Sequence, residues 1–357
     1  MKPAAAIALA LGAATAHAQS NVAIYGIVDA AIVGERGGSA GNLTKVTSGA
    51  GSASRLGFRG SEDLGGGMSA FFTLEAGVKI DTGEIDAAGT IFNRQAFVGL
   101  KTDLGSVALG RQYTPYHTTL VNIVDPFSTG YAGTSKNLFP DSGTNVRTSN
   151  TISYASPRVN GIDGELSYSA GEQTNIRAGR QFGGAIGYAT GELSVRLAYN
   201  SKNSDVAASG GTPAVDHTLG RNTLLGVNYN FGWIKLNVGY GIDKGFNAAP
   251  LGNPNNPYGG VKPTASTDGR DYLLGFSMPA GMGTVLGSVM HKDDRTSFNQ
   301  DANAWGIGYL HPLSKRTSLY AAYAHIKNKN GAGYTVANNT ESGTGNTGYN
   351  LGMRHTF

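Results

Sequence analysis

The chain has 357 residues, a formal net charge of +4, 54 glycines, 17 tyrosines and no cysteine. Without cysteine it has no disulfide framework, no thiolate metal site and no cysteine nucleophile. Beyond the N-terminal segment, no apolar run is long enough for a membrane-spanning helix, and no stretch keeps a sustained helical periodicity. These features leave an all-β protein or a disordered glycine-rich polymer as the two general classes.

The N-terminal eighteen residues have the pattern of a secretory signal. Lys2 precedes an apolar stretch from Ala5 to Ala14, and Ala16-His17-Ala18 fits a small-x-small cleavage site. We therefore expect residues 1–18 to be removed and the mature chain to begin at Gln19. Because this segment contains one lysine and no acid, its removal changes the formal charge from +4 to +3. That charge is modest and scattered, which argues against a nucleic-acid partner.

From about residue 20 onward, apolar and polar residues alternate in one segment after another. Leu56 and Phe58, for example, alternate with Arg55, Gly57 and Arg59. The same two-sided pattern recurs at 193–200, 225–231, 234–240, 271–278 and 349–357. A period of two predicts β-strands with one apolar and one polar face, which argues against disorder. Alternation alone does not separate a soluble sandwich from a barrel in lipid, because both have it.

The connections between these strands alternate in length. Seven short turns, several of them supplied with Gly, Asn or Asp for tight hairpins, lie at 63–67, 102–106, 158–164, 190–191, 230–232, 279–283 and 312–316. Eight longer segments lie near 35–52, 81–90, 112–148, 171–179, 201–220, 243–269, 292–300 and 329–345. Short turns at one end and long loops at the other are typical of outer-membrane barrels. Fifteen connections predict sixteen antiparallel strands. We expect the sheet to close into a barrel, because lipid offers no hydrogen-bond partner to the backbone groups of an open edge.

Residues 112–148 form the longest of these connections. They carry five aromatic residues, which is too many for simple disorder: Tyr113, Tyr116, Phe127, Tyr131 and Phe139. Loops of this length are usually functional or disordered. We expect this loop to fold into the lumen, where its rings can pack. The alternative is an exposed loop at a contact between subunits.

The last strand also favours a membrane barrel. Tyr349, Leu351, Met353, His355 and Phe357 share one face, and the chain stops on that final aromatic. Eight residue steps cover roughly 26 Å of strand. At a tilt near 40° this gives about 20 Å of height, close to the apolar band of an outer-membrane barrel.

Several blocks of sequence, in order along residues 20–357, carry a resemblance to a known family: 22–29 (VAIYGIVD), 54–67 (SRLGFRGSEDLGGG), 92–100 (FNRQAFVGL), 109–112 (LGRQ), 150–154 (NTISY) and 354–357 (RHTF). The chain resembles the Gram-negative general porins, in particular the trimeric, sixteen-stranded type of β-proteobacteria. The resemblance implies a homotrimer in the outer membrane, in contact with lipid and lipopolysaccharide. It also implies passive diffusion of small polar solutes and anions without a cofactor, and a third extracellular loop that narrows the barrel.

The resemblance further implies a constriction in which basic wall residues face acids on or near that loop. Matched by motif, the constriction residues are Arg55, Arg94, Arg147, Glu75 and Asp125. Further lumen charges, expected to screen or pair rather than to select, include Arg59, Arg111 and Lys79. Arginine stays charged, and a cluster of arginines in a narrow neck raises the local anion concentration. The sequence thus predicts anion preference, unless each arginine is paired with a wall acid and only holds the barrel.

Strand parity raises one difficulty with this set. In a regular strand Arg94 shares the outward face of Ala96, Val98 and Leu100. A bulge after Arg94, or a strand that begins at Gln95, would turn its side chain inward.

Other kinds of site find little support. The seven histidines show no metal-binding spacing, and neither a nucleophile elbow nor a phosphate-cradling loop appears. No catalytic residue, cofactor or metal is therefore predicted. The alternatives to a passive pore are a solute-specific channel with saturable flux, an adhesin-like surface barrel, and a barrel enzyme whose triad forms only in space.

Overall fold

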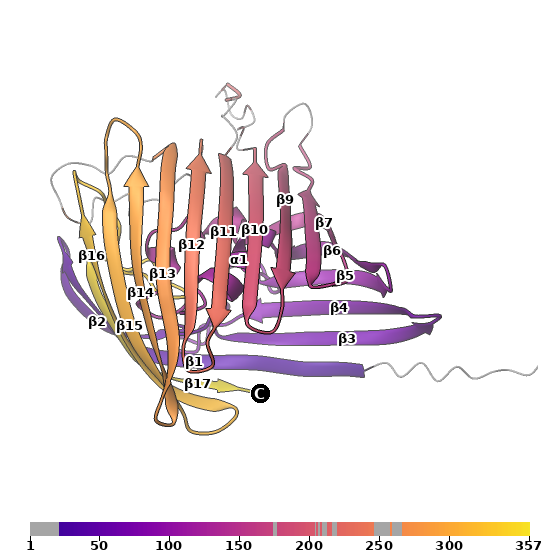
Figure 1. Cartoon of the computed structure of the whole chain (residues 1–357), viewed down its shortest axis with the longest axis horizontal. Helices are drawn as coiled ribbons and strands as arrows, with labels where there is room; N and C mark the ends of the chain where they lie inside the picture. Colours follow the sequence, from indigo (N-terminus) through magenta and orange to yellow (C-terminus); the bar gives the residue numbers. More distant parts are fainter. Residues whose placement is uncertain are drawn as a thin grey trace, which may run out of the picture.

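The computed structural model describes residues 21–173, 177–203, 205, 208, 213–215, 220–245, 258 and 266–357. The expected signal at 1–18 lies outside them, as do parts of the connections expected at 171–179, 201–220 and 243–269. The described chain is an antiparallel β-barrel with a short helical segment inside it (Figure 1). None of its helices is both long enough and apolar enough to cross a membrane.

The wall of the barrel consists of strand segments that pair antiparallel with their neighbours. In chain order they are β1 (Asn21–Gly38), β2 (Gly41–Ser48), β3 (Arg55–Gly65), β4 (Met68–Gly77), β5 (Gln95–Thr102), β6 (Gly105–Tyr113), β7 (Arg147–Ala155), β8 (Ile162–Ser169), β9 (Gln181–Ala189), β10 (Leu193–Lys202), β11 (Gly220–Asn230), β12 (Lys235–Lys244), β13 (Asp268–Ala280), β14 (Gly283–Asp294), β15 (Ala302–Pro312), β16 (Thr317–Asn328) and β17 (Thr347–Thr356). β17 pairs with β1 from Ile27–Thr356 to Arg36–Thr347, which closes the sheet.

The second wall strand is broken in the middle. β2 pairs with the C-terminal part of β1, from Ala30 to Gly38. β3 pairs with the N-terminal part of β1, from Ile27–Arg55 to Asn21–Ser61. Residues 49–54 between them leave the ladder. Counted as one interrupted strand, β2 and β3 bring the barrel to sixteen strands, which confirms the predicted number.

The predicted pattern of connections is confirmed at all seven short turns and wrong at the first long loop. β1 continues to Gly38 and turns directly into β2 at Gly41, so most of 35–52 is strand. The ends of β1 and β2 that meet at this turn are polar, and Lys45 pairs with Glu35 at 2.9 Å. Because this part of the wall lacks apolar alternation, the hydrophobic pattern could not detect it.

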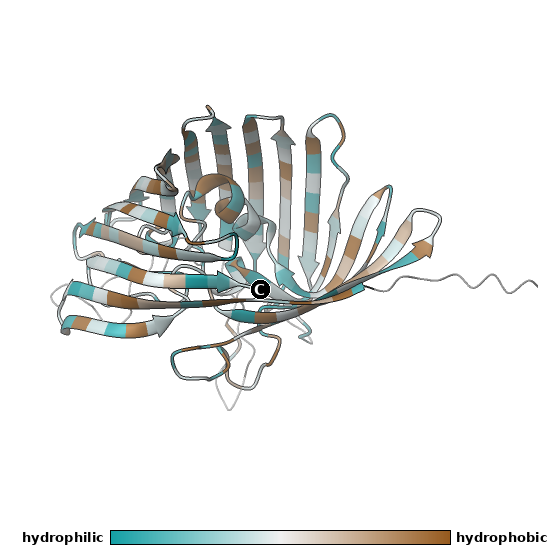
Figure 2. Cartoon of the chain, turned by 90° about the horizontal axis from the view of Figure 1, so that it is seen from below, coloured by the Kyte–Doolittle hydropathy of each residue, from teal (hydrophilic) through white to brown (hydrophobic). Residues whose placement is uncertain are grey.

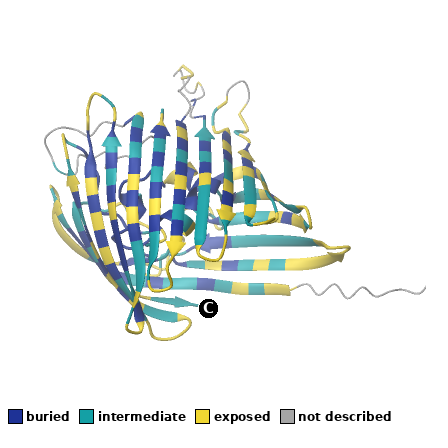
Figure 3. Cartoon of the chain, in the orientation of Figure 1, coloured by how far each residue is buried: buried dark blue, intermediate teal, exposed yellow. Residues whose placement is uncertain are grey.

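The two faces of the wall differ as the alternation predicts. Large apolar side chains remain exposed on the outer face, among them Leu225, Val238, Leu274 and Leu351, of which Leu351 is 57% exposed. Residues of the opposite parity, such as Asn237, are buried inside. The resulting bands run across the strands in Figures 2 and 3. An apolar exterior around a polar interior is the arrangement of a barrel in lipid.

The connection between β6 and β7 fills part of the barrel. It contains α1 (Pro115–Thr119), η1 (Leu120–Val124), η2 (Ser135–Asn137) and η3 (Gly143–Asn145). α1 and η1 lie against the inner face of β8 to β12, and α1 is seen behind these strands in Figure 1. The buried core lies between this loop and the wall, with Tyr116, Leu120, Val124, Phe127 and Phe139 at its centre.

Small and amide side chains on the wall make room for the loop and bind it. Asn228 and Asn237 both donate to the carbonyl oxygen of Ile123, at 3.2 and 2.8 Å. A Cβ atom at Gly226 or Gly239 would collide with Val124. Glycine at these inward positions is therefore a packing requirement, because the loop backbone approaches the sheet closely.

A row of buried polar side chains anchors the end of the loop. The Asn145 amide donates to Asn222 at 3.2 Å, and Asn222 donates to Asp243 at 2.7 Å. Lys292 lies 2.9 Å from Asp243 and 2.8 Å from Asp271, with all three side chains fully buried. Buried charges persist when they are paired and hydrogen-bonded, so this row fixes the loop to the wall.

Candidate functional site: a cationic cavity inside the barrel

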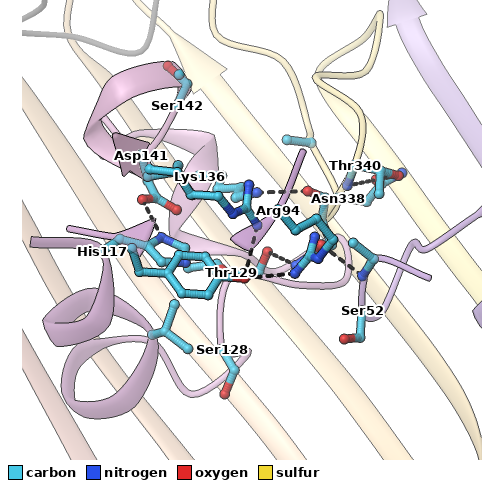
Figure 4. A pocket seen from close by; sticks show the side chains of 18 of the residues that line it. Ser52, Arg94, His117, Ser128, Thr129, Lys136, Asp141, Ser142, Asn338 and Thr340 are labelled. Carbon is cyan, nitrogen blue, oxygen red and sulfur yellow. Dashed lines mark hydrogen bonds and ion pairs between the residues drawn. The ribbon is translucent and has the colours of Figure 1, made fainter. Parts of the chain in front are cut away.

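A cavity of about 840 Å³ lies between the loop and the wall strands β1, β3, β6 and β7. Five cationic side chains line it: Arg55, Arg94, Arg111, Lys136 and Arg147. Three acidic side chains, Asp86, Asp141 and Glu341, also reach it, which leaves a formal excess of two positive charges. Figure 4 shows several of these side chains pointing into the same space.

Glu75 holds two of the arginines on one side of this cavity. The Arg94 Nε lies 2.7 Å from Glu75 Oε1, and Arg55 Nη1 lies 3.8 Å from Glu75 Oε2. The Tyr25 hydroxyl donates to the same carboxylate at 3.0 Å. Glu75 is only 2% exposed, so it sits beneath the arginines rather than facing the cavity. One carboxylate shared by two guanidinium groups leaves a net positive charge.

The other two arginines have neutral partners. The Arg111 Nε donates to the Asn93 carbonyl at 2.6 Å. Arg147 donates to the Tyr113 hydroxyl at 3.0 Å and lies over the Tyr113 ring, 4.6 Å from its centroid. Neither guanidinium forms an ion pair with any carboxylate in the described part of the chain. Their charges are thus not cancelled locally.

Tyr113 joins the arginines to one another. Its hydroxyl accepts from Arg94 at 2.7 Å as well as from Arg147. Its ring stacks on His117, with centroids 4.8 Å apart. Since two like-charged groups are bonded to one phenol oxygen, Tyr113 holds them at a fixed separation against their mutual repulsion.

The break in the second wall strand positions Arg55. Segment 49–54 is drawn inward by Asp29, whose carboxylate accepts from the backbone N–H groups of Gly51 and Ser52 at 3.3 and 3.0 Å. The Arg55 Nε then donates to the Ala53 carbonyl at 2.9 Å, and Nη2 to the Ser52 hydroxyl at 2.9 Å. These contacts direct the guanidinium along the cavity wall.

The loop contributes its own charged groups. His117 Nδ1 lies 2.8 Å from Asp141 Oδ1, and this contact is visible in Figure 4. Burial lowers the pKa of His117, although Asp141 opposes the shift. Neighbouring His117 and Lys136 outweigh burial and lower the pKa of Asp141. Burial likewise lowers the pKa of Lys136.

The structure brings together most of the residues that were expected at a constriction. Arg55, Arg94 and Arg147 line one cavity, and Arg111 joins them. β5 begins at Gln95, so Arg94 precedes the regular strand and turns inward, the second of the two arrangements considered.

The expected opposing acids lie elsewhere. Glu75 is on the same wall as the arginines, because β3 and β4 are paired neighbours. Asp125 is buried within the loop, where it accepts from the backbone N–H groups of Phe127, Thr129 and Ser135 at 2.8, 2.9 and 2.8 Å. Its carboxylate shapes the loop and does not line the cavity, so its predicted place was wrong.

Two of the secondary charges are also outside the cavity. Arg59 lies over the ring of Tyr25, at 5.1 Å. Lys79 is in the connection after β4 and lies 3.5 Å from Glu84. Lys136, His117 and Asp141 were not anticipated, because the fold of an irregular loop decides which of its residues face inward. The described residues contain no cluster of three or more histidines or acids placed to hold a metal ion.

A closed barrel with an apolar exterior and a charged inner cavity defines a membrane channel. The sequence model of the family described as Gram-negative porin matches residues 4–331. An outer membrane porin protein of Delftia acidovorans is 35% identical, over 98% of this chain and 99% of its own length. One of Bordetella pertussis is 29% identical, over 99% and 98%.

Solved structures agree with these relatives. The anion-selective porin from Comamonas acidovorans superposes with a TM-score of 0.73 and 30% identity, over 95% of this chain and all of the other. OmpF of Salmonella typhi, at 15% identity and a TM-score of 0.69, shares the fold. The chain belongs to the Gram-negative porin family. It is an outer-membrane β-barrel that acts as a passive channel for small solutes and not as an enzyme.

Proposed function

We propose that the cavity is the constriction of an anion-preferring pore and that its arginines select the ions. The observation that carries this proposal is the charge balance: four arginines and a lysine line the cavity against three acids, and two of those arginines share Glu75 beneath them as their carboxylate partner. Fixed positive charge in a narrow, partly dehydrated neck concentrates anions and repels cations. The anion-selective porin from Comamonas acidovorans, which has the same fold at 30% identity, supports this direction.

The geometry argues against arginines that serve only to hold the barrel. Arg111 and Arg147 bond to neutral oxygens, and their charge stays available to a permeating ion. The loop from 112 to 148 narrows the passage in this proposal. Solutes then pass by diffusion through the remaining opening, and their fluxes rise linearly with concentration.

Reversal potentials test the role of the arginines. The protein is reconstituted in planar bilayers under a KCl gradient, as wild type and as Arg55→Ala/Arg147→Ala. We expect anion selectivity in the wild type and a weaker one in the variant. Arg158→Ala is the matched control, since Arg158 pairs with Asp163 near a short turn, away from the cavity. Selectivity that survives the double substitution unchanged would place the filter elsewhere.

The assembly is part of the same proposal. The chain functions as a homotrimer in lipid and lipopolysaccharide, after removal of residues 1–18. A shallow apolar groove of about 430 Å³ on the outer face of β1, β2, β16 and β17 supports a contact with a second copy. Chemical cross-linking of the protein purified from membranes tests this, with a three-chain product as the expected outcome and a single-chain product as the contrary one.

A further inference from the structure

The connection between β16 and β17, residues 329–346, turns into the mouth of the barrel. Residues 337–342 line the same cavity as the arginines and loop residues 128–129 and 136. Tyr334, Val336 and Ala337 are buried, and the Ala337 backbone N–H donates to the Asn137 side chain at 2.7 Å. Two loops that are about 200 positions apart in sequence thus meet above the cavity.

Asn339 lies where these loops meet. Its side-chain Nδ2 donates to the Thr129 carbonyl at 2.9 Å, and its Oδ1 accepts from the Ala53 backbone N–H at 2.9 Å. Its backbone N–H donates to the Ala50 carbonyl at 3.2 Å. One uncharged residue therefore joins the last connection, the break in the second wall strand and the long inner loop.

Asn339 also holds a cation. Its carbonyl oxygen accepts from Lys136 Nζ at 2.7 Å. Lys136 lines the cavity and lies beside Arg94 in Figure 4. It forms no ion pair with any carboxylate that the structure describes. A carbonyl orients an ammonium group without neutralising it, so the positive charge remains available to passing ions.

We propose that Asn339 is a positioning residue for ion selection, which holds Lys136 as a loop-borne cation that adds to the arginines of the wall. This role rests on the proposed function, since it requires that the cavity selects anions. Asn339 carries no charge, so it can affect selectivity only through the cations that it positions, and the one it contacts directly is Lys136. Its side-chain bonds to Thr129 and Ala53 keep the carbonyl in place for the lysine.

A double-substitution cycle tests the proposal. Reversal potentials and current fluctuations are recorded for the wild type, Asn339→Ala, Lys136→Met and the double variant in planar bilayers under a KCl gradient. By Coulomb's law in water, loss of a charge about 6 Å from the ion changes the favourability of chloride and of potassium about threefold each and in opposite senses, so the chloride-to-potassium permeability ratio changes about tenfold. We expect Lys136→Met to lower the ratio by that factor and Asn339→Ala to lower it by part of it. Asn339→Ala should cause no further drop when Lys136 is already replaced.

Asn330→Gly is the matched control. Asn330 belongs to the same connection, lies away from the cavity and donates to the Asn299 carbonyl at 2.7 Å. Its φ of 49° suits glycine. This variant should keep the wild-type ratio. Migration of unheated samples in detergent gels shows whether each variant has folded into a barrel.

Two results would overturn the proposal. One is a wild-type permeability ratio in folded Asn339→Ala. The other is a drop of the same size with Lys136 present or replaced, which would mean that Asn339 does not act through the lysine. A wild-type channel without anion preference would overturn the proposed function itself, and it would be seen before any substitution is made.

Discussion

Glu75→Gln should raise anion preference and lower stability at the same time. Glu75 is the carboxylate beneath the arginines, 2.7 Å from Arg94 and 3.8 Å from Arg55. Removing one partner of a buried ion pair costs about 3–5 kcal/mol, because the remaining charge loses its compensation. Glutamine keeps the volume and one acceptor oxygen, so we expect a loss of about 3 kcal/mol, near the lower end of that range.

The effect on selectivity has the opposite sign. A negative charge about 8 Å from the permeating ion contributes a factor of roughly 2.4 for each ion in water, in opposite senses for chloride and potassium, so its removal should raise the chloride-to-potassium permeability ratio about sixfold. The reversal potential under a KCl gradient measures this ratio, and urea unfolding in detergent measures the stability. Glu62→Gln, an exposed glutamate on β3, is the control and should change neither. A ratio that falls or stays constant in Glu75→Gln would mean that this carboxylate does not offset the arginines.

Three further changes test the loop and the cluster. Tyr113→Phe removes the oxygen shared by Arg94 and Arg147, which should cost about 1–3 kcal/mol in urea unfolding and broaden the distribution of single-channel conductance. Asp125→Ala removes the acceptor for three backbone N–H groups, so the loop should become sensitive to protease while the barrel stays folded. The pKa of His117 lies below its usual 6.5 because of burial, so the protein should lose stability as the pH falls below about 6.5, where the unfolded histidine binds a proton first. His117→Gln should remove that part of the pH dependence of unfolding, and an unchanged profile would contradict the assignment.

Much of the wall could be predicted because each strand and short turn is determined by residues that are neighbours in the sequence. Alternation at 225–231 and 271–278 marks strands, and glycines at the short turns mark their ends. The first long loop was predicted wrongly in place of strand because Glu35 and Lys45 lie on strand ends above the apolar band, where lipid no longer imposes alternation. The break at 49–54 depends on Asp29, which is distant in sequence and gives no local signal.

The site was predicted only where a motif fixed a residue on the wall. Arg55 belongs to β3, so its direction follows from parity, and Arg147 at the start of β7 was placed by its motif. Asp125 was misplaced because a carboxylate in an irregular loop can serve backbone N–H groups as well as ions. Lys136 and Asn339 were missed because their contact joins two loops about 200 positions apart.

The most direct test of the central claim is the sign of the reversal potential of the wild-type protein in a planar bilayer under a KCl gradient. We expect the sign of an anion-preferring channel, set by the arginines and Lys136 around the cavity. A potential of the opposite sign, from a channel that prefers potassium, would contradict it.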